Sequence, residues 1–359
     1  MRGLWTALTA TARNSCQKET ATNLLRRICT SGACQRASDE GQVQQNIFDR
    51  AVKRSQRDRA AALQAGDLDP LTDAVADNIL DRLDDCRPSF PTIAVVGGAT
   101  LPILTKLATS RHATGSVLVL DESPAMLRRT KLLVEKQASN VPWSQIHYIE
   151  ADAEFLPLQE KSLDAVISCL SLHWVNDVPG AMAQMRRALK PDGLFLAAMW
   201  GGDTLHELRV ALALAEQTLE GGVSQRMSPL AQVRDAGNLL TRAGYSIPSV
   251  DTDDVTVHYS SPMHLVRHLR AMGESNAATG RQPRLKQATW QAAESKYVEM
   301  FGAEDGSVPA TFQAIYMTGW APAPKQARPA PRGSATLSFE DLEKTLANES
   351  KGEAPKPSG

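Results

Sequence analysis

Residues 149–209, IEADAEFLPLQEKSLDAVISCLSLHWVNDVPGAMAQMRRALKPDGLFLAAMWGGDTLHELR, decide the fold of this chain. Within them, Leu163–Ser168 and Leu194–Met199 have the length and composition of strands, and the amphipathic stretch between them predicts a helix. Parallel strands buried on both faces have such continuous apolar runs. Asp152 and Ser171–Trp174 follow predicted strands, where ligands of open α/β sheets bind. The stretch therefore predicts half of a ligand crevice in a doubly wound sheet.

The same alternation of apolar strands and helices extends to both sides of this stretch. Three further parallel strands are predicted at Ile93–Gly97, Ser116–Leu120 and Gln145–Ile149, and two closing strands, one of them antiparallel, at Tyr245–Tyr259 and Phe312–Trp320. We therefore expect an α/β domain with a mostly parallel, doubly wound, seven-stranded sheet of the Rossmann-like type. Its expected boundaries are 39–90 for N-terminal helices, 91–320 for the α/β domain, about 203–305 for a helical insertion and 321–359 for a Pro/Ala-rich tail.

Composition narrows the class of protein. The 359 residues are 42% hydrophobic and carry a formal net charge of −1, which describes a globular chain without a bias toward nucleic acid. No apolar run reaches the roughly 20 residues of a membrane-spanning helix. Three of the five cysteines lie in the first 34 residues, so neither a disulfide framework nor a cysteine metal site is expected.

The N-terminal segment has the character of a targeting sequence. Residues 1–38 contain six arginines and lysines against one acid, Glu19, together with many serines and threonines. Such Arg-rich, acid-poor, amphipathic segments are typical of mitochondrial transit peptides. A disordered basic tail is the alternative interpretation. We predict localisation in the mitochondrial matrix.

The turn after the first strand is the first candidate for a cofactor contact. Gly97, Gly98 and Ala99 are small residues that let the backbone approach a ligand at a helix N-terminus. Val95 stands where an acid is usual in such loops, and Leu101 stands where a last glycine is usual. The cofactor loop is therefore degraded relative to Gly-x-Gly-x-Gly.

Acidic residues after later strands are further candidates. Asp121 follows the second strand, where a carboxylate can accept both ribose hydroxyls, and Glu122 beside it is a second candidate. Alternatively, Asp121 caps the helix that begins near Pro124. Asp152 and Ala153 follow the third strand, and the alternative for Asp152 is a simple turn residue.

Several motifs resemble one known family. They are ADAEFLPLQEKSLDAVISCLSLHWVNDVPGAM, RRALKPDGLFLAAMWGGDTLHELR, SVDTDDVTVHY, RAMGESNA, EDGSVPATFQAIYMTGW and QARPAPRGSATLSF. The chain resembles the mitochondrial respiratory complex I assembly factors of the S-adenosylmethionine (SAM) methyltransferase superfamily. The similarity runs from Phe48 to about Phe339, and GGDTLHELR, MGESNA and EDGSVPAT are its most specific parts.

The resemblance implies a class I SAM methyltransferase fold and a protein-arginine hydroxylase. It implies SAM as the cofactor, with Asp152 at the adenine amino group, Ala153 leaving room for the ring and Ser171 bordering the crevice. An iron–sulfur subunit of complex I and its assembly intermediates are the implied partners, with peripheral association at the inner membrane left open. Two alternatives remain: a non-catalytic assembly chaperone and a SAM-dependent methyltransferase. The family usually keeps Asp-x-Gly-x-Gly at Val95–Leu101, and this chain does not.

Three residues are candidates for a catalytic role. His173 faces the expected substrate side and is either a base or a structural histidine. Asp203 either caps a helix or binds a substrate guanidinium. Asp305, with Glu274 and Glu304, lies in a loop motif of the family, and carboxylates there suit an arginine because its planar fork pairs with them bidentately.

Two other patterns admit a site but are interpreted as ordinary structure. His264 and His268 stand four residues apart and could share a metal, yet the segment has the pattern of an amphipathic helix, so we predict no metal site. The basic run Lys53–Arg59 could contact an acidic ligand or a partner, and we interpret it as a solvated helix face.

Overall fold

The computed structural model describes residues 46–63, 69–86, 89–112, 115–137, 145–282 and 284–326. The predicted leader, residues 1–38, and nearly all of the tail over 321–359 lie outside these ranges. The chain divides into residues 1–322 and a second unit, 323–359. The described part of the second unit is a turn in which the Gln326 amide donates to the Ala323 carbonyl oxygen over 3.2 Å.

The helices and strands follow the predicted alternation. In chain order they are α2 (Arg50–Leu63), α3 (Pro70–Asp84), β1 (Thr92–Gly98), α4 (Thr100–Leu107), β2 (Ser116–Asp121), α5 (Pro124–Gln137), β3 (Gln145–Glu150), β4 (Leu163–Cys169), the 3-10 turn η2 (Leu172–Trp174), α6 (Val178–Ala188), β5 (Leu189–Trp200), α7 (His206–Glu220), α8 (Val233–Arg242), β6 (Ser246–Tyr259), α9 (Pro262–Met272), α10 (Gln287–Phe301) and β7 (Val308–Trp320).

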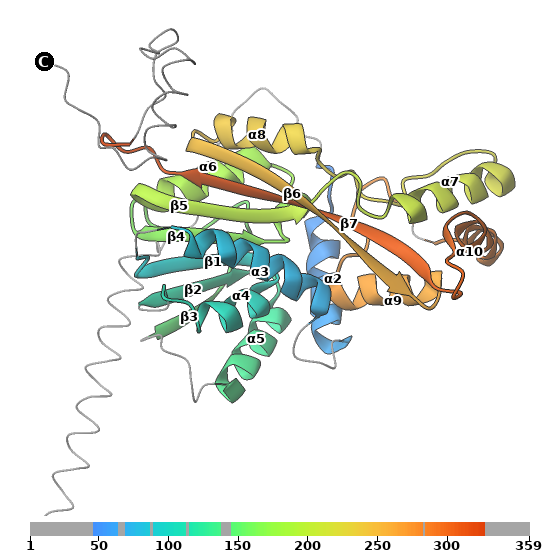
Figure 1. Cartoon of the computed structure of the whole chain (residues 1–359), viewed down its shortest axis with the longest axis horizontal. Coiled ribbons are helices and arrows are strands. Elements are labelled where there is room, and N and C mark those ends of the chain that lie inside the picture. Colours follow the sequence, from blue (N-terminus) through green and yellow to red (C-terminus); the bar gives the residue numbers. More distant parts are fainter. Residues whose placement is uncertain are drawn as a thin grey trace, which may run out of the picture. The chain divides into compact units, whose positions relative to one another are not determined.

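One seven-stranded sheet organises the domain (Figure 1), in the order β3-β2-β1-β4-β5-β7-β6. Strands β1 to β5 are parallel to one another, and β7 runs antiparallel to both β5 and β6. The predicted mostly parallel, doubly wound sheet is confirmed, including the single antiparallel strand. The expected insertion range of about 203–305 contains more than helices, because β6 completes the sheet within it.

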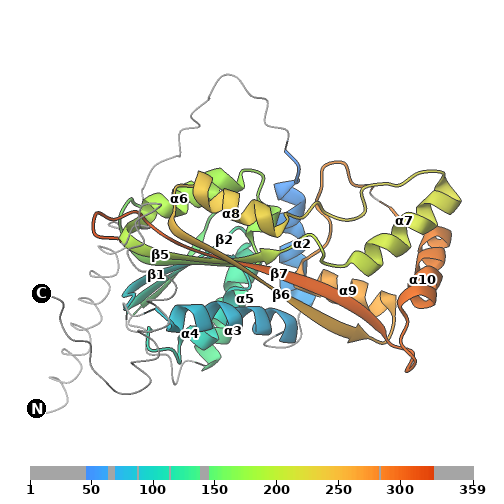
Figure 2. The same cartoon turned by 45° about the horizontal axis from the view of Figure 1, so that its top comes forward.

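Both faces of the sheet are buried, which explains the continuous apolar runs of its strands. Ile93 and Val95 of β1 belong to one apolar cluster, whereas Ala94 and Val96 belong to the other, because successive side chains point to opposite faces. Figure 2 shows α3 and α4 on one side of the sheet, and α6 and α8 on the other. Because helices cover both faces, other elements can contact the sheet at the carboxyl ends of its parallel strands.

Helix α2 covers those carboxyl ends, although most of the side chains that it buries are polar or charged. Its buried side chains are Lys53, Gln56, Arg57 and Ala60. The interpretation of the basic run as a solvated face holds for Arg54, whose side chain is exposed, and is wrong for Lys53 and Arg57. Buried cations need ion-pair or hydrogen-bond partners. The partners of Lys53 and Arg57 lie at the candidate functional site.

Beyond β5, the first half of β7 is supported by loop and side-chain atoms. The Gly201 amide donates to the Gln313 carbonyl oxygen over 2.7 Å, and the Leu205 amide donates to that of Thr311 over 2.7 Å. The buried Glu207 carboxylate accepts hydrogen bonds from the Thr311 amide and hydroxyl. Helix α7 is thereby fixed to the sheet, and α10 packs beside it (Figure 1).

Candidate functional site

The glycine turn after β1 is shaped by contacts within the chain. Gly97 and Gly98 have φ of 61° and 62°, in the left-handed region that favours glycine. A methyl group added at Gly98 would collide with the Cys169 carbonyl oxygen, and one added at Gly97 would collide with the Ser171 hydroxyl. The Ala99 amide donates to the Cys169 carbonyl oxygen over 2.9 Å. The glycines therefore allow a close approach to the residues at and after the end of β4, and the predicted contact of this turn with a cofactor stays a prediction.

Asp121 lies at the end of β2, and its carboxylate is fully engaged. Its side chain is 3% exposed and forms an ion pair with Arg57, whose side chain is 8% exposed. One oxygen also accepts from the Ser123 amide over 2.8 Å. The alternative helix-cap role belongs instead to Ser123, whose hydroxyl accepts from the Met126 amide over 3.1 Å at the start of α5. Asp121 therefore holds an arginine.

Arg50 holds the second set of predicted cofactor contacts. Its guanidinium group lies 2.8 Å from Glu122 Oε2 and 2.8 Å from Asp152 Oδ1. It also donates to the Trp174 carbonyl oxygen over 2.9 Å. Burial raises the pKa of Glu122, and the nearby arginines counteract that shift. The structure thus brings together Asp121, Glu122 and Asp152, as the sequence predicts, but around two arginines of the same chain.

The residues of the crevice do not fit an adenosyl cofactor while α2 lies over them. The cavity that remains between Gly97, Asp121, Ala153, Ser171 and α2 has a volume of about 20 Å³. A single water needs about 10–15 Å³ by the same kind of measure. A nucleoside cannot enter this space.

A buried cluster lies behind the crevice, around Glu274. His173 Nε2 and Glu274 Oε2 form a hydrogen bond of 3.0 Å, and Trp174 Nε1 donates to the same oxygen over 2.8 Å. Lys53 Nζ lies 3.9 Å from Glu274 and 3.3 Å from the centre of the Trp174 ring, and it donates to the Gly273 carbonyl oxygen over 2.6 Å. The cluster joins α2 to the residues after α9.

Burial and neighbouring charges act in opposite directions on the pKa of Lys53 and on that of Glu274. It lowers the pKa of Lys53 to about 7, despite the attraction of Glu274. Burial alone would raise the pKa of Glu274, but Lys53, His173 and Trp174 outweigh it and lower that pKa to about 2. Glu274 is therefore ionised at neutral pH, and Lys53 is near its midpoint of titration.

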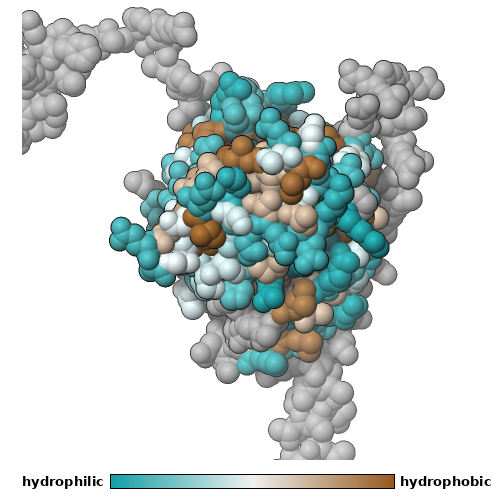
Figure 3. Space-filling view, turned by 90° about the vertical axis from the view of Figure 1, so that its right-hand side faces the viewer, coloured by the Kyte–Doolittle hydropathy of each residue, from teal (hydrophilic) through white to brown (hydrophobic). Residues whose placement is uncertain are grey.

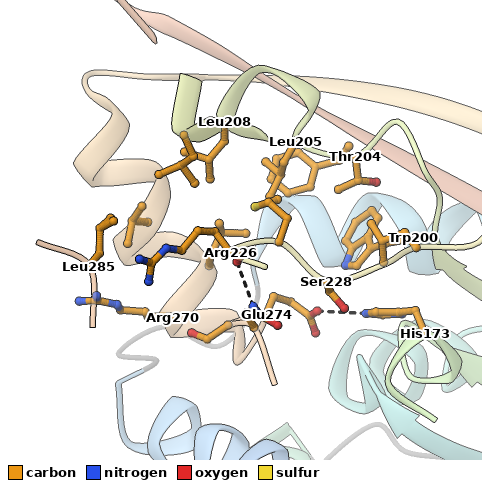
Figure 4. A pocket seen from close by; sticks show the side chains of 18 of the residues that line it. His173, Trp200, Thr204, Leu205, Leu208, Arg226, Ser228, Arg270, Glu274 and Leu285 are labelled. Atoms are coloured by element: carbon orange, nitrogen blue, oxygen red, sulfur yellow. Dashed lines mark hydrogen bonds and ion pairs between the residues drawn. The ribbon is translucent and has the colours of Figure 1, made fainter. Parts of the chain in front are cut away.

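An apolar pocket of about 470 Å³ opens on the other side of Glu274 (Figure 4). It lies between the end of β5, helices α7, α9 and α10, and the segment after α7. Most of its wall is apolar, and the principal apolar residues are Trp200, Leu205, Leu208, Leu212, Met227, Leu230, Val266, Leu269, Leu285, Trp290 and Phe312. A largely apolar cavity of this size with a few convergent polar groups is typical of a ligand site.

Three polar side chains meet at the inner end of the pocket, while others such as Arg226 and Arg270 line it elsewhere. His173, Ser228 and Glu274 lie close together there (Figure 4). His173 Nδ1 and Ser228 Oγ are buried and have no hydrogen-bond partner among the described residues. Both bonds that Glu274 accepts there from side chains fall on Oε2, which leaves Oε1 for a ligand. Buried polar atoms are normally bonded, so the inner end suits a polar ligand group.

Two of the predicted catalytic candidates lie apart from this pocket. Asp203 accepts from Gln313 Nε2 over 3.1 Å and does not line the pocket; its neighbour Thr204 does. Helix α7 begins after Leu205, so Asp203 is not its cap. Asp305 lies in the exposed turn before β7, where its carboxylate accepts from the Ser307 amide and hydroxyl. Their roles in substrate binding remain predictions.

Another hollow, of about 320 Å³, lies along α7 and the segment after it. In Figure 3 the hydrophobic residues on the side of α7 and α10 lie as separate patches among hydrophilic ones. The two histidines of α9 are engaged by protein groups: His268 bonds to Asp69 over 2.8 Å and to Tyr259 over 2.7 Å, and His264 bonds to Ser260. The described residues contain no group of three or more His, Cys, Asp or Glu placed to hold a metal ion.

The sheet order, the glycine turn after β1 and the acids after β2 and β3 define a class I SAM methyltransferase fold. Residues 95–197 match the family model described as a methyltransferase domain. The chain is 44% identical to the mitochondrial arginine-hydroxylase NDUFAF5 of Danio rerio, over 83% of this chain and 90% of that protein. It is 43% identical to the Homo sapiens protein of the same name, over 90% and 91%. The chain belongs to the arginine-hydroxylase NDUFAF5 family.

A more distant relative is a methyltransferase. The malonyl-[acyl-carrier protein] O-methyltransferase of Laribacter hongkongensis is 32% identical over 81% of this chain and 93% of that protein. The names of the NDUFAF5 relatives state that they are mitochondrial, which confirms the predicted mitochondrial localisation. Within the described ranges, no helix is long and apolar enough to cross a membrane.

Sequence reasoning missed the arginines that occupy the crevice. Arg50, Lys53 and Arg57 follow helical spacing and share one face with Ala60, whereas Arg54 is exposed at the edge of that face and Arg59 lies opposite it. This spacing was the available signal, because an all-solvated helix does not need to sort its charges by face. Ser228 had no sequence signal, since it lines the pocket only through the fold.

Proposed function

We propose that this chain is a complex I assembly factor of the mitochondrial matrix that hydroxylates an arginine of an iron–sulfur subunit of complex I. Two relatives named as arginine-hydroxylases, alignable over most of both chains, support the reaction class. The motifs of the complex I assembly factor family, from Phe48 to about Phe339, support the partner.

The observation that carries the proposal is the ionised carboxylate at the inner end of an apolar pocket. The aliphatic stem of an arginine would lie along walls such as Leu208 and Leu269, and its guanidinium group would meet Glu274 Oε1. Charge-assisted hydrogen bonds of this kind are about twice as strong as neutral ones. The pocket exceeds what one side chain fills, so residues that flank the arginine enter it too.

The reaction replaces a C–H bond of the arginine with a C–OH bond. It needs an activated oxygen species, which enzymes normally generate on a cofactor. The part of this chain is to bind and orient the side chain and to exclude water around it. His173 Nδ1 and Ser228 Oγ are the groups placed to fix that orientation.

The surroundings of the pocket suit a polypeptide with acidic residues. A hollow of about 690 Å³ adjoins the pocket and shares Arg226 and Arg270 with it. Arg59 and Arg281 complete four arginines in its wall, and none of the described residues that line it is an acid. Glu216 pairs with Arg226 and Asp49 pairs with Arg281, so part of the positive charge is left for a partner. Complementary charge of this kind steers partners and fixes their register.

A non-catalytic assembly chaperone is the second candidate. The ion pairs of Arg50 and Arg57 with the predicted cofactor contacts favour it, because they leave no space for an adenosyl group. A SAM-dependent methyltransferase acting on a partner remains the third, supported by the O-methyltransferase relative.

Mass spectrometry of complex I subunit peptides from cells with and without this protein separates the three. Loss of one oxygen from an arginine in its absence would support the hydroxylase, and loss of a methyl group would support the methyltransferase. Failed assembly with unchanged peptides would support the chaperone. Cells carrying Glu274→Gln should lose the modification, whereas cells carrying Glu299→Gln, an exposed residue of α10, should keep it. Retained modification with Glu274→Gln would refute the role of this pocket.

A further inference from the structure

Three cations on one face of α2 meet acids from separate parts of the fold. Arg57 pairs with Asp121 after β2, and Arg50 pairs with Glu122 and with Asp152 after β3. Lys53, between the two arginines, reaches the cluster around Glu274. The spacing of three and four residues places all three on one stripe of the helix.

Arg57 takes up the positions that a nucleoside would need. Besides its ion pair with Asp121, it donates to the Gly98 carbonyl oxygen over 3.2 Å, directly at the glycine turn. The carboxylate that could accept ribose hydroxyls and the turn that could approach the ligand are therefore bound by the same guanidinium group. Arg50 likewise binds Glu122 and Asp152, the other predicted acidic contacts of the cofactor.

For electrostatic reasons, the ion pairs of Arg50 and Arg57 and a bound cofactor exclude each other. Arginine stays charged under all ordinary conditions, and a neutral ribose cannot replace its carboxylate partner. If a cofactor displaced Asp121 from Arg57 while α2 stayed in place, a cation of 8% exposure would lose its ion pair. Among the described residues it would keep only the Gly98 carbonyl oxygen and the more distant Glu122 and Glu274. Uncompensated buried charges are strongly destabilising. Cofactor entry thus requires α2 to leave the crevice and bring its arginines into water.

We propose that Arg57, together with Arg50, decides whether this crevice accepts an adenosyl cofactor, because it holds the carboxylate that the cofactor's ribose would need. In the closed state the guanidinium groups of α2 stand in place of the cofactor. SAM binds only to molecules in which α2 has left, so its apparent affinity is reduced by the fraction of open molecules. The departure from the family's Asp-x-Gly-x-Gly loop accords with a crevice closed in this way.

Calorimetry with the full-length chain tests the proposal, with SAM and S-adenosylhomocysteine as probes. Arg57→Ala and Arg50→Ala should each bind the probes at least about tenfold more tightly than the wild type, because the open fraction rises. Arg54→Ala is the matched control on the same helix; it removes an exposed pair with Glu150 and should leave the affinity unchanged. Weaker binding by Arg57→Ala than by a wild type that binds well would overturn the proposal, since α2 would then be a clamp on the cofactor.

Hydrogen exchange of the wild-type chain provides a second measurement that does not depend on a substituted protein folding. A saturating concentration of SAM should speed exchange of the amides of Arg50–Leu63 if the helix leaves the crevice. Slower exchange of these amides would contradict the proposal. Both experiments measure cofactor binding alone, so their outcome is independent of whether an arginine of complex I is modified.

Discussion

The two sides of Glu274 differ in almost every physical respect. On the side of β1, β2 and β3, acids and arginines are paired, and two small cavities of about 20 and 60 Å³ remain. On the side of α7, α9 and α10, the walls are apolar, the volume is about 470 Å³, and His173 Nδ1 and Ser228 Oγ lack partners in the described part of the chain. On the side expected to bind a cofactor, the acids are paired with arginines and Arg50 Nε alone among the buried atoms of these ion pairs lacks a described hydrogen-bond partner, whereas the other side is open to a ligand. The polar atoms that lack partners and the free volume therefore indicate which half of the crevice can take a ligand, and the fold type alone does not.

Breaking the ion pair of Arg57 and Asp121, on the cofactor side of Glu274, should give the largest change in stability. Arg57→Ala leaves the buried Asp121 carboxylate without its cation, and we expect a loss of about 3–5 kcal/mol in the free energy of unfolding. Urea denaturation measures it. The double variant Arg57→Met with Asp121→Leu should recover much of that loss, because well-packed apolar residues can replace a buried pair. A small effect of the single variant would show that the pair is not buried in solution.

Removing the charge at the boundary should have a smaller effect. Glu274→Gln loses charge-assisted bonds from His173 and Trp174, for an expected cost of about 2 kcal/mol. It should also change the response to acid. Since the pKa of Glu274 falls from 4.5 to about 2 on folding, its contribution is complete above pH 4.5 and is lost as the pH falls toward 2. Denaturation series across that range should show the loss in the wild type and not in the variant.

A substitution at Ser228, in the apolar pocket, should leave the free energy of unfolding nearly unchanged. Ser228→Ala removes a hydroxyl that has no partner in the described structure, so the free energy of unfolding should stay equal or rise by less than about 1 kcal/mol. Arginine modification should fall by about two- to tenfold, the value of one neutral hydrogen bond. Thermal unfolding and peptide mass spectrometry measure the two effects. A clear loss of stability would mean that Ser228 is bonded within the protein.

The smallest change in folding should come from the arginine-lined hollow. Arg270→Ser alters an exposed residue, so stability should change by less than about 0.5 kcal/mol. Binding to the complex I subunit should slow, and its salt dependence should weaken, because a steering charge is lost. Surface plasmon resonance at two ionic strengths measures this. Arg234→Ser on α8, 81% exposed, is the matched control and should bind as the wild type does.

Sequence alone predicts the elements better than the contacts between them. Each buried strand is an apolar run, and Asp121 and Asp152 follow such runs, so strands and acids could both be located. Their partners could not, because Arg50 and Arg57 are separated from these acids by 102 and 64 residues in the chain. The hydrogen bond between His173 and Glu274 spans 101 residues. The spacing of charges along a helix can be read from the sequence, because it is local. Which acids pair with those charges depends on the tertiary structure and cannot be read in the same way.

The attachment of α7 to β7 determines how the pocket can respond to a ligand. The Glu207 carboxylate bonds to Thr311, and the Leu205 amide bonds to its carbonyl oxygen, so the wall that contains Leu205 and Leu208 is tied to the sheet. A wall held in this way loses little conformational entropy when a ligand arrives, which favours affinity. The same rigidity limits the range of shapes that fit. This wall of the pocket is thus preorganised, and a ligand must fit the shape that it already has.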